Sequence, residues 1–169
     1  MTPTDFKLLA DLLKARSGLI VTEDKTYLLD SRLAPVARKH GLADLPALCQ
    51  ALRASDKGPL AADVIEAMTT NESFFFRDIT PFEKFKDVVL PSLKQTRGGK
   101  RQIKIWSAAW SSGQEPYSLA IQLNEQKAAW AGWSFDIVAT DLSEEMVQKA
   151  KEGVYSQFEV QRGLPVQLL

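Results

Sequence analysis

Two turns in the second half of the chain carry residues that could bind a nucleoside. The turn "AWSSGQE", Ala109–Glu115, follows a β-rich run, and its small residues and Gly113 let the backbone approach a ligand closely. The other turn begins at Asp141, the last residue of the β-rich run "WSFDIVATD", where a carboxylate can accept hydrogen bonds from both hydroxyls of a ribose. Ligands of open α/β sheets bind beyond the carboxyl ends of the strands, so both turns are expected at a ligand site.

Each of these signals also has a purely structural interpretation. Asp141 could simply begin the helix that follows it, and Glu115 could be a first-turn acid that faces the helix dipole. The first turn lacks the GxGxxG pattern of dinucleotide-binding proteins, which disfavours a nucleotide-dependent oxidoreductase, and the sequence has no GxxxxGK[ST] phosphate loop. Taken together, the two acids favour a nucleoside site more strongly than either does alone.

The stretch "TTNESFFFRD" places three phenylalanines, Phe74, Phe75 and Phe76, directly before Arg77. Successive side chains of a helix diverge by about 100°, so three adjacent rings cannot all face one core. We expect the segment to lie between two bodies, with some rings packed on each; a purely hydrophobic hinge is the alternative. Arg77 is expected to clamp a ligand carboxylate through its planar guanidinium, although a surface salt bridge would also account for it.

The elements that position these residues fall into two halves. Residues 1–68 carry apolar side chains at helical spacing and predict an all-α domain, with Asp44 capping its third helix and Pro35 kinking or breaking its second. Residues 69–80 are predicted to form an interdomain linker that contributes to the ligand site. Residues 81–169 form the second predicted domain.

The second half changes from a helical to a strand period. A helix is expected from Thr80, where the T-x-x-E pattern is typical of a capping box. The runs Ile103–Ala109 and Trp133–Asp141 predict buried strands, each followed by a helix, and Ser143 is the expected cap of the second helix. The order strand, helix, strand, helix predicts an α/β fold with a parallel sheet.

Composition bounds the remaining possibilities. The 169 residues include 21 Lys and Arg and 21 Asp and Glu, so the formal net charge is zero and no global field favours binding to nucleic acid. No apolar run approaches the ~20 residues of a membrane span and no signal peptide is evident, so we expect a cytoplasmic protein without membrane insertion. Cys49 and His40 are each the only residue of their type, so no metal site is expected, and Cys49 is expected in the core.

Four runs of the sequence together resemble the CheR-type chemotaxis receptor methyltransferases: "MTTNESFFFRD", "IWSAAWSSGQEPYSLAI", "IVATDLSEEMVQKAKEGVYS" and "EVQRGLP". The front end with "SRLAPVARKHGL" is similar too, so the resemblance covers essentially the whole chain. It implies an all-α domain followed by the start of a Rossmann-like methyltransferase domain with an incomplete parallel sheet. It also implies methyl transfer from S-adenosylmethionine to glutamate side chains of methyl-accepting chemotaxis receptors, with S-adenosylhomocysteine as the product.

The resemblance also assigns roles to individual residues. Asn71 and Ser73 would border the cofactor, and Arg77 would bind its methionine carboxylate and so position it for catalysis. Glu115 would meet the amino end of the cofactor, and Asp141 would hold its ribose. A cluster of cations on the second predicted helix, which alone could be a solvated face, would meet the receptor. Its members are Arg32, Arg38 and Lys39.

Two features depart from the family pattern. The resemblance predicts a seven-stranded sheet with an inserted β-subdomain, whereas this sequence supplies two clear strands, so we expect a truncated, inactive or impaired form. Such a sheet is expected to self-associate through its first strand or by exchanging an element between chains.

Trp110 stands where the family commonly has a small residue, and it either obstructs the cofactor space or points into the core. The alternative function is therefore a non-catalytic module that binds the receptor or itself.

Overall fold

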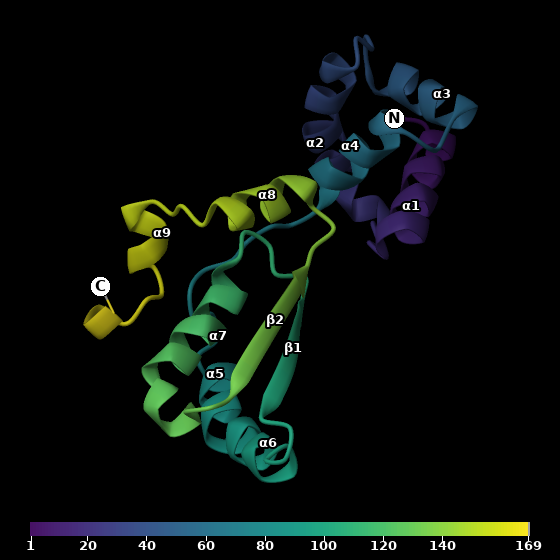
Figure 1. The fold of residues 1–169 in the computed structure, drawn as a ribbon. Helices are drawn as coiled ribbons and strands as arrows, with labels where there is room; N and C mark the ends of the chain where they lie inside the picture. The colour runs from purple at the N-terminus through teal and green to yellow at the C-terminus, as the bar shows by residue number, and fades with distance from the viewer. Residues whose placement is uncertain (169) are drawn as a thin grey trace. The chain divides into compact units, whose positions relative to one another are not determined.

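The computed structural model describes residues 1–168 and divides the chain into two compact units, Met1–Thr70 and Asn71–Leu169 (Figure 1). The first unit is all helical, which confirms the predicted front end. Its elements are α1 (Pro3–Ser17), a 3₁₀ turn (Glu23–Lys25), α2 (Thr26–Lys39), α3 (Leu45–Ala54) and α4 (Pro59–Met68).

Local sequence explains most of these helices, with one exception. Asp44 accepts the backbone N–H of Ala47 at 2.9 Å and caps α3, as predicted. Of the kink or break predicted at Pro35, the break is wrong, because α2 continues through this residue as one helix, and the kink stays a prediction. Proline removes a backbone hydrogen bond, but the buried side chains of Leu33 and Val36 on either side of it hold the helix against the core.

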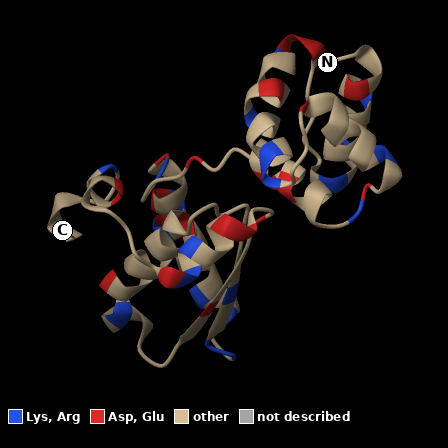
Figure 2. Ribbon diagram, turned by 90° about the horizontal axis from the view of Figure 1, so that it is seen from above, with Lys and Arg blue, Asp and Glu red and all other residues tan. Residues whose placement is uncertain are grey.

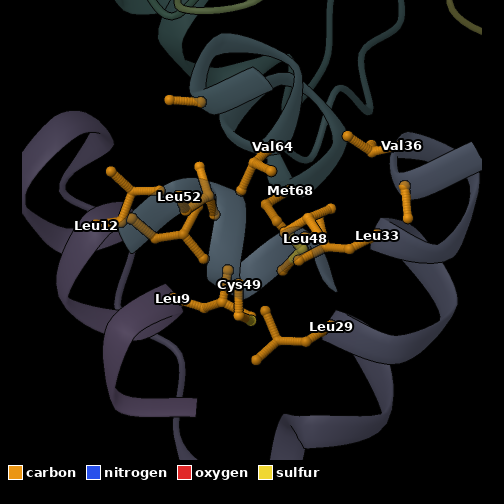
Figure 3. Close-up of a cluster of buried hydrophobic side chains, with 13 residues drawn as sticks. Leu9, Leu12, Leu29, Leu33, Val36, Leu48, Cys49, Leu52, Val64 and Met68 are labelled. Atoms are coloured by element: carbon orange, nitrogen blue, oxygen red, sulfur yellow. The ribbon is translucent and has the colours of Figure 1, made fainter. Parts of the chain in front are cut away.

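The four helices of the first unit share one apolar core (Figure 3). Cys49 lies in this core without solvent exposure, which confirms its prediction. Burial raises the pKa of the Cys49 thiol to about 11, so the thiol is a poor nucleophile at neutral pH. Burying one large apolar side chain contributes roughly 1.5–3 kcal/mol. The labelled core residues are Leu9, Leu12, Leu29, Leu33, Val36, Leu48, Cys49, Leu52, Val64 and Met68.

The second unit contains both helices and strands. It begins with one helical segment made of α5 (Thr80–Lys84), a π-helical stretch (Phe85–Val89) and α6 (Leu90–Thr96). The elements that follow are β1 (Gln102–Ala108), α7 (Gln114–Glu125), a 3₁₀ turn (Lys127–Trp130), β2 (Ser134–Thr140), α8 (Glu144–Glu152), α9 (Gln157–Gln161) and a 3₁₀ turn (Val166–Leu168).

β1 and β2 form a two-stranded parallel sheet and pair in register over the seven residues of each strand. The predicted order of strands and helices and the parallel pairing are therefore confirmed. Because the strands are parallel, both carboxyl ends lie at the same edge of the sheet (Figure 1). The turn 109–113 leaves β1 there and Asp141 leaves β2 there, as the position of a ligand site in an α/β sheet requires.

The two faces of the sheet differ in their covering, since side chains alternate between the faces along each strand. On the open face Trp106 has 71% of its surface exposed, and its register partner Val138 has 52% exposed. Lys104 and Asp136 form an ion pair of 3.7 Å on the same face. The other face belongs to an apolar core formed by Leu90, Ile103, Leu123 and Trp130.

The start of α8 agrees with the prediction, whereas the start of α5 differs from it. Ser143 accepts a backbone N–H at 3.1 Å and caps α8, as predicted. The predicted capping box of Thr80 and Glu83 is wrong, because Ile79 takes the cap position and no side chain caps α5. Asp78 has a left-handed φ of 54°, and this turn starts the helix one residue earlier than the pattern indicates.

Charges of both signs lie on the helices of each unit (Figure 2). This distribution agrees with the formal net charge of zero. Within residues 1–168, no helix combines the length and the apolar character that a membrane span requires.

Candidate functional site

The turn between β1 and α7 has a backbone conformation that few residues adopt readily. Ala109, Ser111 and Gly113 have φ angles of 59°, 55° and 99°, all in the left-handed region. A non-glycine residue there costs of order 1–3 kcal/mol and persists only where its surroundings hold it. The N–H of Ala109 donates to the carbonyl of Thr140 at 2.8 Å, which extends the strand pairing into the turn. The turn is therefore fixed at the carboxyl ends of both strands.

Asp141 follows β2 and binds this turn directly. Its Oδ2 accepts the N–H of Ser111 at 2.6 Å, and its Oδ1 accepts the N–H of Ser143 at 2.9 Å. The hydroxyl of Ser111 donates to the carbonyl of Asn71 at 2.9 Å. The structure thus brings Asp141 and Asn71 together through Ser111. A carboxylate has about four acceptor positions, so these two bonds leave Asp141 capacity for a ligand.

Two of the predicted cofactor residues line one pocket. Arg77 and Glu115 lie on the wall of a pocket of about 500 Å³. Oε1 of Glu115 accepts the hydroxyl of Ser107, on β1, at 2.6 Å, which fixes the direction of the carboxylate. A guanidinium and a carboxylate in one pocket match the two charges of an amino-acid zwitterion. The other lining residues are Asp78, Pro81, Phe82, Phe85 and Leu119.

The remaining predicted cofactor residues form a second group. Asp141, Asn71 and Ser73 do not line the pocket of Arg77 and Glu115. Asp141 and Asn71 lie at the strand ends, as described above, and Ser73 is half-buried in the segment that leads from Asn71 to Arg77. This segment, residues 71–77, therefore connects the strand ends to the pocket.

Arg77 is held by neighbours in its own segment. Its Nη1 donates to the carbonyl of Glu72 at 2.6 Å, and its guanidinium lies 5.7 Å from the centre of the Phe74 ring. Phe76 and Asp78, on either side of it, have left-handed φ angles of 51° and 54°. The contact with the Asp78 carboxylate is long, 3.9 Å, and 47% of the Arg77 side chain is exposed. Its remaining donors are therefore accessible to a ligand.

The phenylalanine rings of this segment pack within the second unit. Phe75 is buried and meets Tyr155 edge-on with 5.1 Å between ring centres, and Phe76 meets Phe82 in the same way at 5.1 Å. Such pairs contribute about 0.5–1.5 kcal/mol beyond their buried area. These contacts give no support to the prediction that the rings divide between two bodies. They hold residues 71–77 against the unit that carries the strands.

Two residues of the site have roles that the sequence patterns do not predict. The hydroxyl of Tyr155 donates to the carbonyl of Ser112 at 2.7 Å, and burial raises the pKa of Tyr155 to about 12. A Cβ on Gly113 would lie 2.7 Å from the Tyr155 oxygen, so glycine is required there. The signal for Tyr155 is a tyrosine two residues after Gly153, which ends α8. The signal for Ser107, the partner of the glutamate in the pocket, is a hydroxyl near the carboxyl end of the predicted strand, two residues before the turn.

Trp110 lies in the same turn and is half-buried. Its indole nitrogen is buried and has no hydrogen-bond partner within residues 1–168. Trp110 does not line the pocket of Arg77 and Glu115. Its obstruction of the cofactor space therefore stays a prediction.

The three cations predicted to face the receptor lie on α2, in the first unit. Arg32 also has an internal role, because its Nη1 donates to the carbonyls of Met68 and Thr69 at 3.1 and 3.2 Å. These bonds satisfy carbonyl groups at the carboxyl end of α4. Arg38 is exposed.

Lys39, the third of these cations, pairs with Asp63 on α4. The ammonium lies 2.8 Å from the carboxylate, and this contact, together with His40, holds the pKa of Asp63 below its ordinary value. The Lys39 side chain is nevertheless 67% exposed. An exposed pair of this kind contributes at most about 1 kcal/mol, so Lys39 remains available to a partner.

Comparison with known families shows which family the chain belongs to. Residues 71–169 match the CheR methyltransferase, SAM binding domain. The chain belongs to the CheR methyltransferase family. The helical unit of this CheR chain agrees, since residues 4–69 match the CheR methyltransferase, all-alpha domain. The resemblance predicted from the sequence is therefore confirmed.

Curated relatives of the CheR chain show the same likeness. It is 42% identical over 163 residues to Chemotaxis protein methyltransferase 1 of Pseudomonas aeruginosa, covering 95% of this chain and 59% of the relative. It is 39% identical over 163 residues to Chemotaxis protein methyltransferase Cher2 of Pseudomonas putida, with the same two shares covered. For the Chemotaxis protein methyltransferase of Vibrio parahaemolyticus the identity is 39% over 162 residues, with 95% and 58% covered. The chain thus spans about 59% of the length of these relatives.

Proposed function

We propose that this CheR chain binds S-adenosylmethionine and takes part in methyl transfer to glutamate side chains of methyl-accepting chemotaxis receptors. The observation that carries the proposal is the pocket of about 500 Å³ that Arg77 and Glu115 line together. Its opposite charges suit the carboxylate and the ammonium of a methionine group. The match of residues 71–169 to the SAM binding domain of the family supports the same ligand.

In this proposal the predicted residues bind the two ends of the methyl donor. Arg77 would bind the methionine carboxylate and Glu115 the ammonium, while Asp141 would accept the ribose hydroxyls with the capacity that its two backbone contacts leave. Asn71 and Ser73 would border the same cofactor. When bound, S-adenosylmethionine supplies a methyl group activated by its sulfonium leaving group.

The residues of the chain itself hold and orient the methyl donor. A receptor glutamate has a reference pKa of ~4.3 and is ionised at neutral pH, so it needs no general base to accept a methyl group. Arg77, fixed by the carbonyl of Glu72, acts as a positioning residue for the methyl donor. Glu115, fixed by Ser107, orients the other charge. Orientation of this kind can supply effective molarities of roughly 10⁵ M.

Receptor binding belongs, in this proposal, to α2. Arg38 is exposed and the Lys39 side chain is 67% exposed, so both can meet an acidic receptor surface. The resemblance includes Arg32 in the same surface, although its guanidinium also caps α4. The cytoplasmic location expected from the sequence, and the absence of a nucleic-acid partner, remain part of the proposal.

A second candidate function is a non-catalytic module that self-associates. The observation that favours it is the open sheet face, where Trp106 and its register partner Val138 are 71% and 52% exposed. The opposite charges of Lys104 and Asp136 on the same face make that face self-complementary in a two-fold dimer. Such a dimer would bury the two apolar side chains without any ligand.

Transfer of radiolabelled methyl from S-adenosylmethionine to a chemoreceptor signalling fragment tests the first candidate. We expect base-labile label in the receptor, because methyl esters hydrolyse in base, and loss of the label in Arg77→Gln. A receptor fragment whose methylated glutamates are changed to alanine is the control and should remain unlabelled. Receptor that stays unlabelled although the chain is folded and sediments as a dimer would favour the second candidate instead.

A further inference from the structure

We infer that Arg162 is a positioning residue for Arg77 and acts on it through Glu72 and Phe74. Arg162 belongs to the "RGLP" run, whose conformation the cofactor chemistry described above does not explain. The consequence for ligand binding rests on the proposed function, whereas the positioning itself is a property of the unliganded chain.

Glu72 binds Arg77 through its backbone carbonyl and Arg162 through its side-chain carboxylate. Its backbone carbonyl accepts Nη1 of Arg77 at 2.6 Å, and its carboxylate accepts Nη2 of Arg162 at 2.7 Å. The ion pair with Arg162 therefore fixes the residue whose carbonyl orients the Arg77 guanidinium. Glu72 and Arg162 are 90 positions apart, so the contact is a tertiary one.

Phe74 supplies the second connection. The guanidinium of Arg162 lies 4.7 Å from the centre of the Phe74 ring, and that of Arg77 lies 5.7 Å from it. Both distances are within the range of a cation–π contact. The hydrogen bond from Arg162, followed by the positive charges of Arg162 and Arg77, lowers the pKa of the Glu72 carboxyl. Glu72 therefore stays ionised and offsets the repulsion of the two guanidinium groups.

Gly163 brings Arg162 to this place. A Cβ on Gly163 would lie 1.9 Å from the carbonyl oxygen of Phe75, so the two backbones are in direct contact and no other residue fits. Residue 163 follows α9, and Glu159 of α9 is paired with Lys149 of α8 at 2.5 Å. The stretch after α9, which lies in the yellow part of the chain in Figure 1, thereby contacts the segment that carries Arg77.

The exposure of the Arg162–Glu72 pair indicates that it positions Arg77 more than it stabilises the fold. The side chains of Arg162 and Glu72 are 43% and 56% exposed. A pair with this exposure contributes little to the free energy of unfolding. Its removal should therefore leave the folded state intact while freeing the backbone and the ring that hold Arg77.

The direct test is the mobility of the Arg77 guanidinium in the unliganded chain, measured by ¹⁵Nε relaxation. We expect a rigid Arg77 in the natural chain and an order parameter below about 0.6 in Arg162→Gln. Arg97→Gln, which removes another exposed arginine of the second unit, is the matched control and should leave Arg77 rigid. Arg162→Lys should restore part of the order, since it keeps the charge. An Arg77 side chain equally ordered in the natural chain and in Arg162→Gln would overturn the inference.

Ligand binding provides a second readout. S-adenosylhomocysteine carries the carboxylate that Arg77 would bind, whereas 5′-methylthioadenosine lacks it. Arg162→Gln should weaken S-adenosylhomocysteine about five- to tenfold and leave methylthioadenosine within about twofold. Equal weakening of both ligands indicates general damage and contradicts positioning. If the natural chain binds neither ligand, the proposed function fails, and the relaxation measurement still decides the role of Arg162.

Discussion

At the scale of single residues, the candidate site is built from groups that stabilise the fold and still have hydrogen-bonding capacity for a ligand. Asp141 accepts two backbone N–H groups, from Ser111 and Ser143, and keeps acceptor capacity. Arg77 donates to one backbone carbonyl and keeps donors accessible. Residues fixed in this way lose little conformational freedom when a ligand binds, which is the physical advantage of a preorganised site.

Gly113 gives the sharpest residue-scale prediction. In Gly113→Ala the new methyl group meets the Tyr155 hydroxyl at 2.7 Å and the Ala150 Cβ at 2.9 Å, at a φ of 99° that alanine disfavours. We expect a loss of about 2–3 kcal/mol in the free energy of unfolding, measured by urea denaturation. Gly99→Ala is the control, because a Cβ there meets nothing within 4 Å, and its change should stay within about 0.5 kcal/mol. Equal stabilities of the two variants would contradict the packing described for Tyr155.

Residue roles could be predicted from sequence where the resemblance or a local pattern marks them. Cys49 in the core and Asp44 as a cap follow from neighbours a few positions away. Arg162 could not be predicted in the same way, because its partner Glu72 is 90 positions distant. The hydrogen bond from Tyr155 to Ser112 spans 43 positions and escapes prediction for the same reason.

At the scale of elements, α9 is fixed by an ionised glutamate. Glu159 accepts the ammonium of Lys149 and the N–H and hydroxyl of Ser156, and these contacts lower its pKa from 4.5 to about 2. A lowered pKa means that the stabilisation is fully present above pH 4.5 and is lost as the pH falls toward 2.

Glu159→Gln should therefore destabilise the chain by about 0.5–1 kcal/mol at pH 7, a value that allows for solvent screening of a partly exposed pair. The difference from the natural chain should shrink below pH 4.5 and vanish near pH 2. Urea unfolding between pH 2 and 7 measures it, with Glu152→Gln on the exposed face of α8 as the control. A difference that does not change with pH would show that the carboxylate charge is not the cause.

Most helices and strands could be predicted from the sequence, and two local patterns gave wrong predictions. Strand runs bounded by turn residues predict β1 and β2, and Ser143 predicts the start of α8. Pro35 does not break α2, because packing of the helix outweighs one lost hydrogen bond. Thr80 misleads because the left-handed turn at Asp78 starts α5 before the capping pattern does.

At the scale of the whole molecule, the open sheet face gives a prediction about assembly. Each strand has one edge without a strand partner within the described residues, and the open face exposes Trp106 and Val138. We expect concentration-dependent dimerisation in sedimentation velocity, reduced at least about tenfold in Trp106→Lys because a charge replaces the exposed ring. Ile20→Lys changes an equally exposed apolar residue of the first unit and should leave the equilibrium unchanged. A monomer at all concentrations would contradict this assembly.

The overall architecture was predictable because each half of the chain has its own hydrophobic period. The first 70 residues carry a helical period and form their own core, and the remainder alternates strands and helices. Family resemblance also pointed to Arg77 and Glu115, which the structure brings to one pocket. Of the other predicted cofactor residues, Asp141 and Asn71 lie at the strand ends and Ser73 lies in the segment that leads to the pocket. This division could not be predicted, because it depends on the path of residues 71–77.

The central claim is that Arg77 and Glu115 bind the amino-acid end of the methyl donor. Calorimetric titration of S-adenosylhomocysteine into the natural chain, Arg77→Gln, Glu115→Gln and the control Arg97→Gln tests it most directly. We predict saturable binding to the natural chain and the control, and affinities at least about tenfold weaker for the other two variants, because each loses a charge-assisted contact. Binding of equal strength to all four proteins, or none to the natural chain, would contradict the claim.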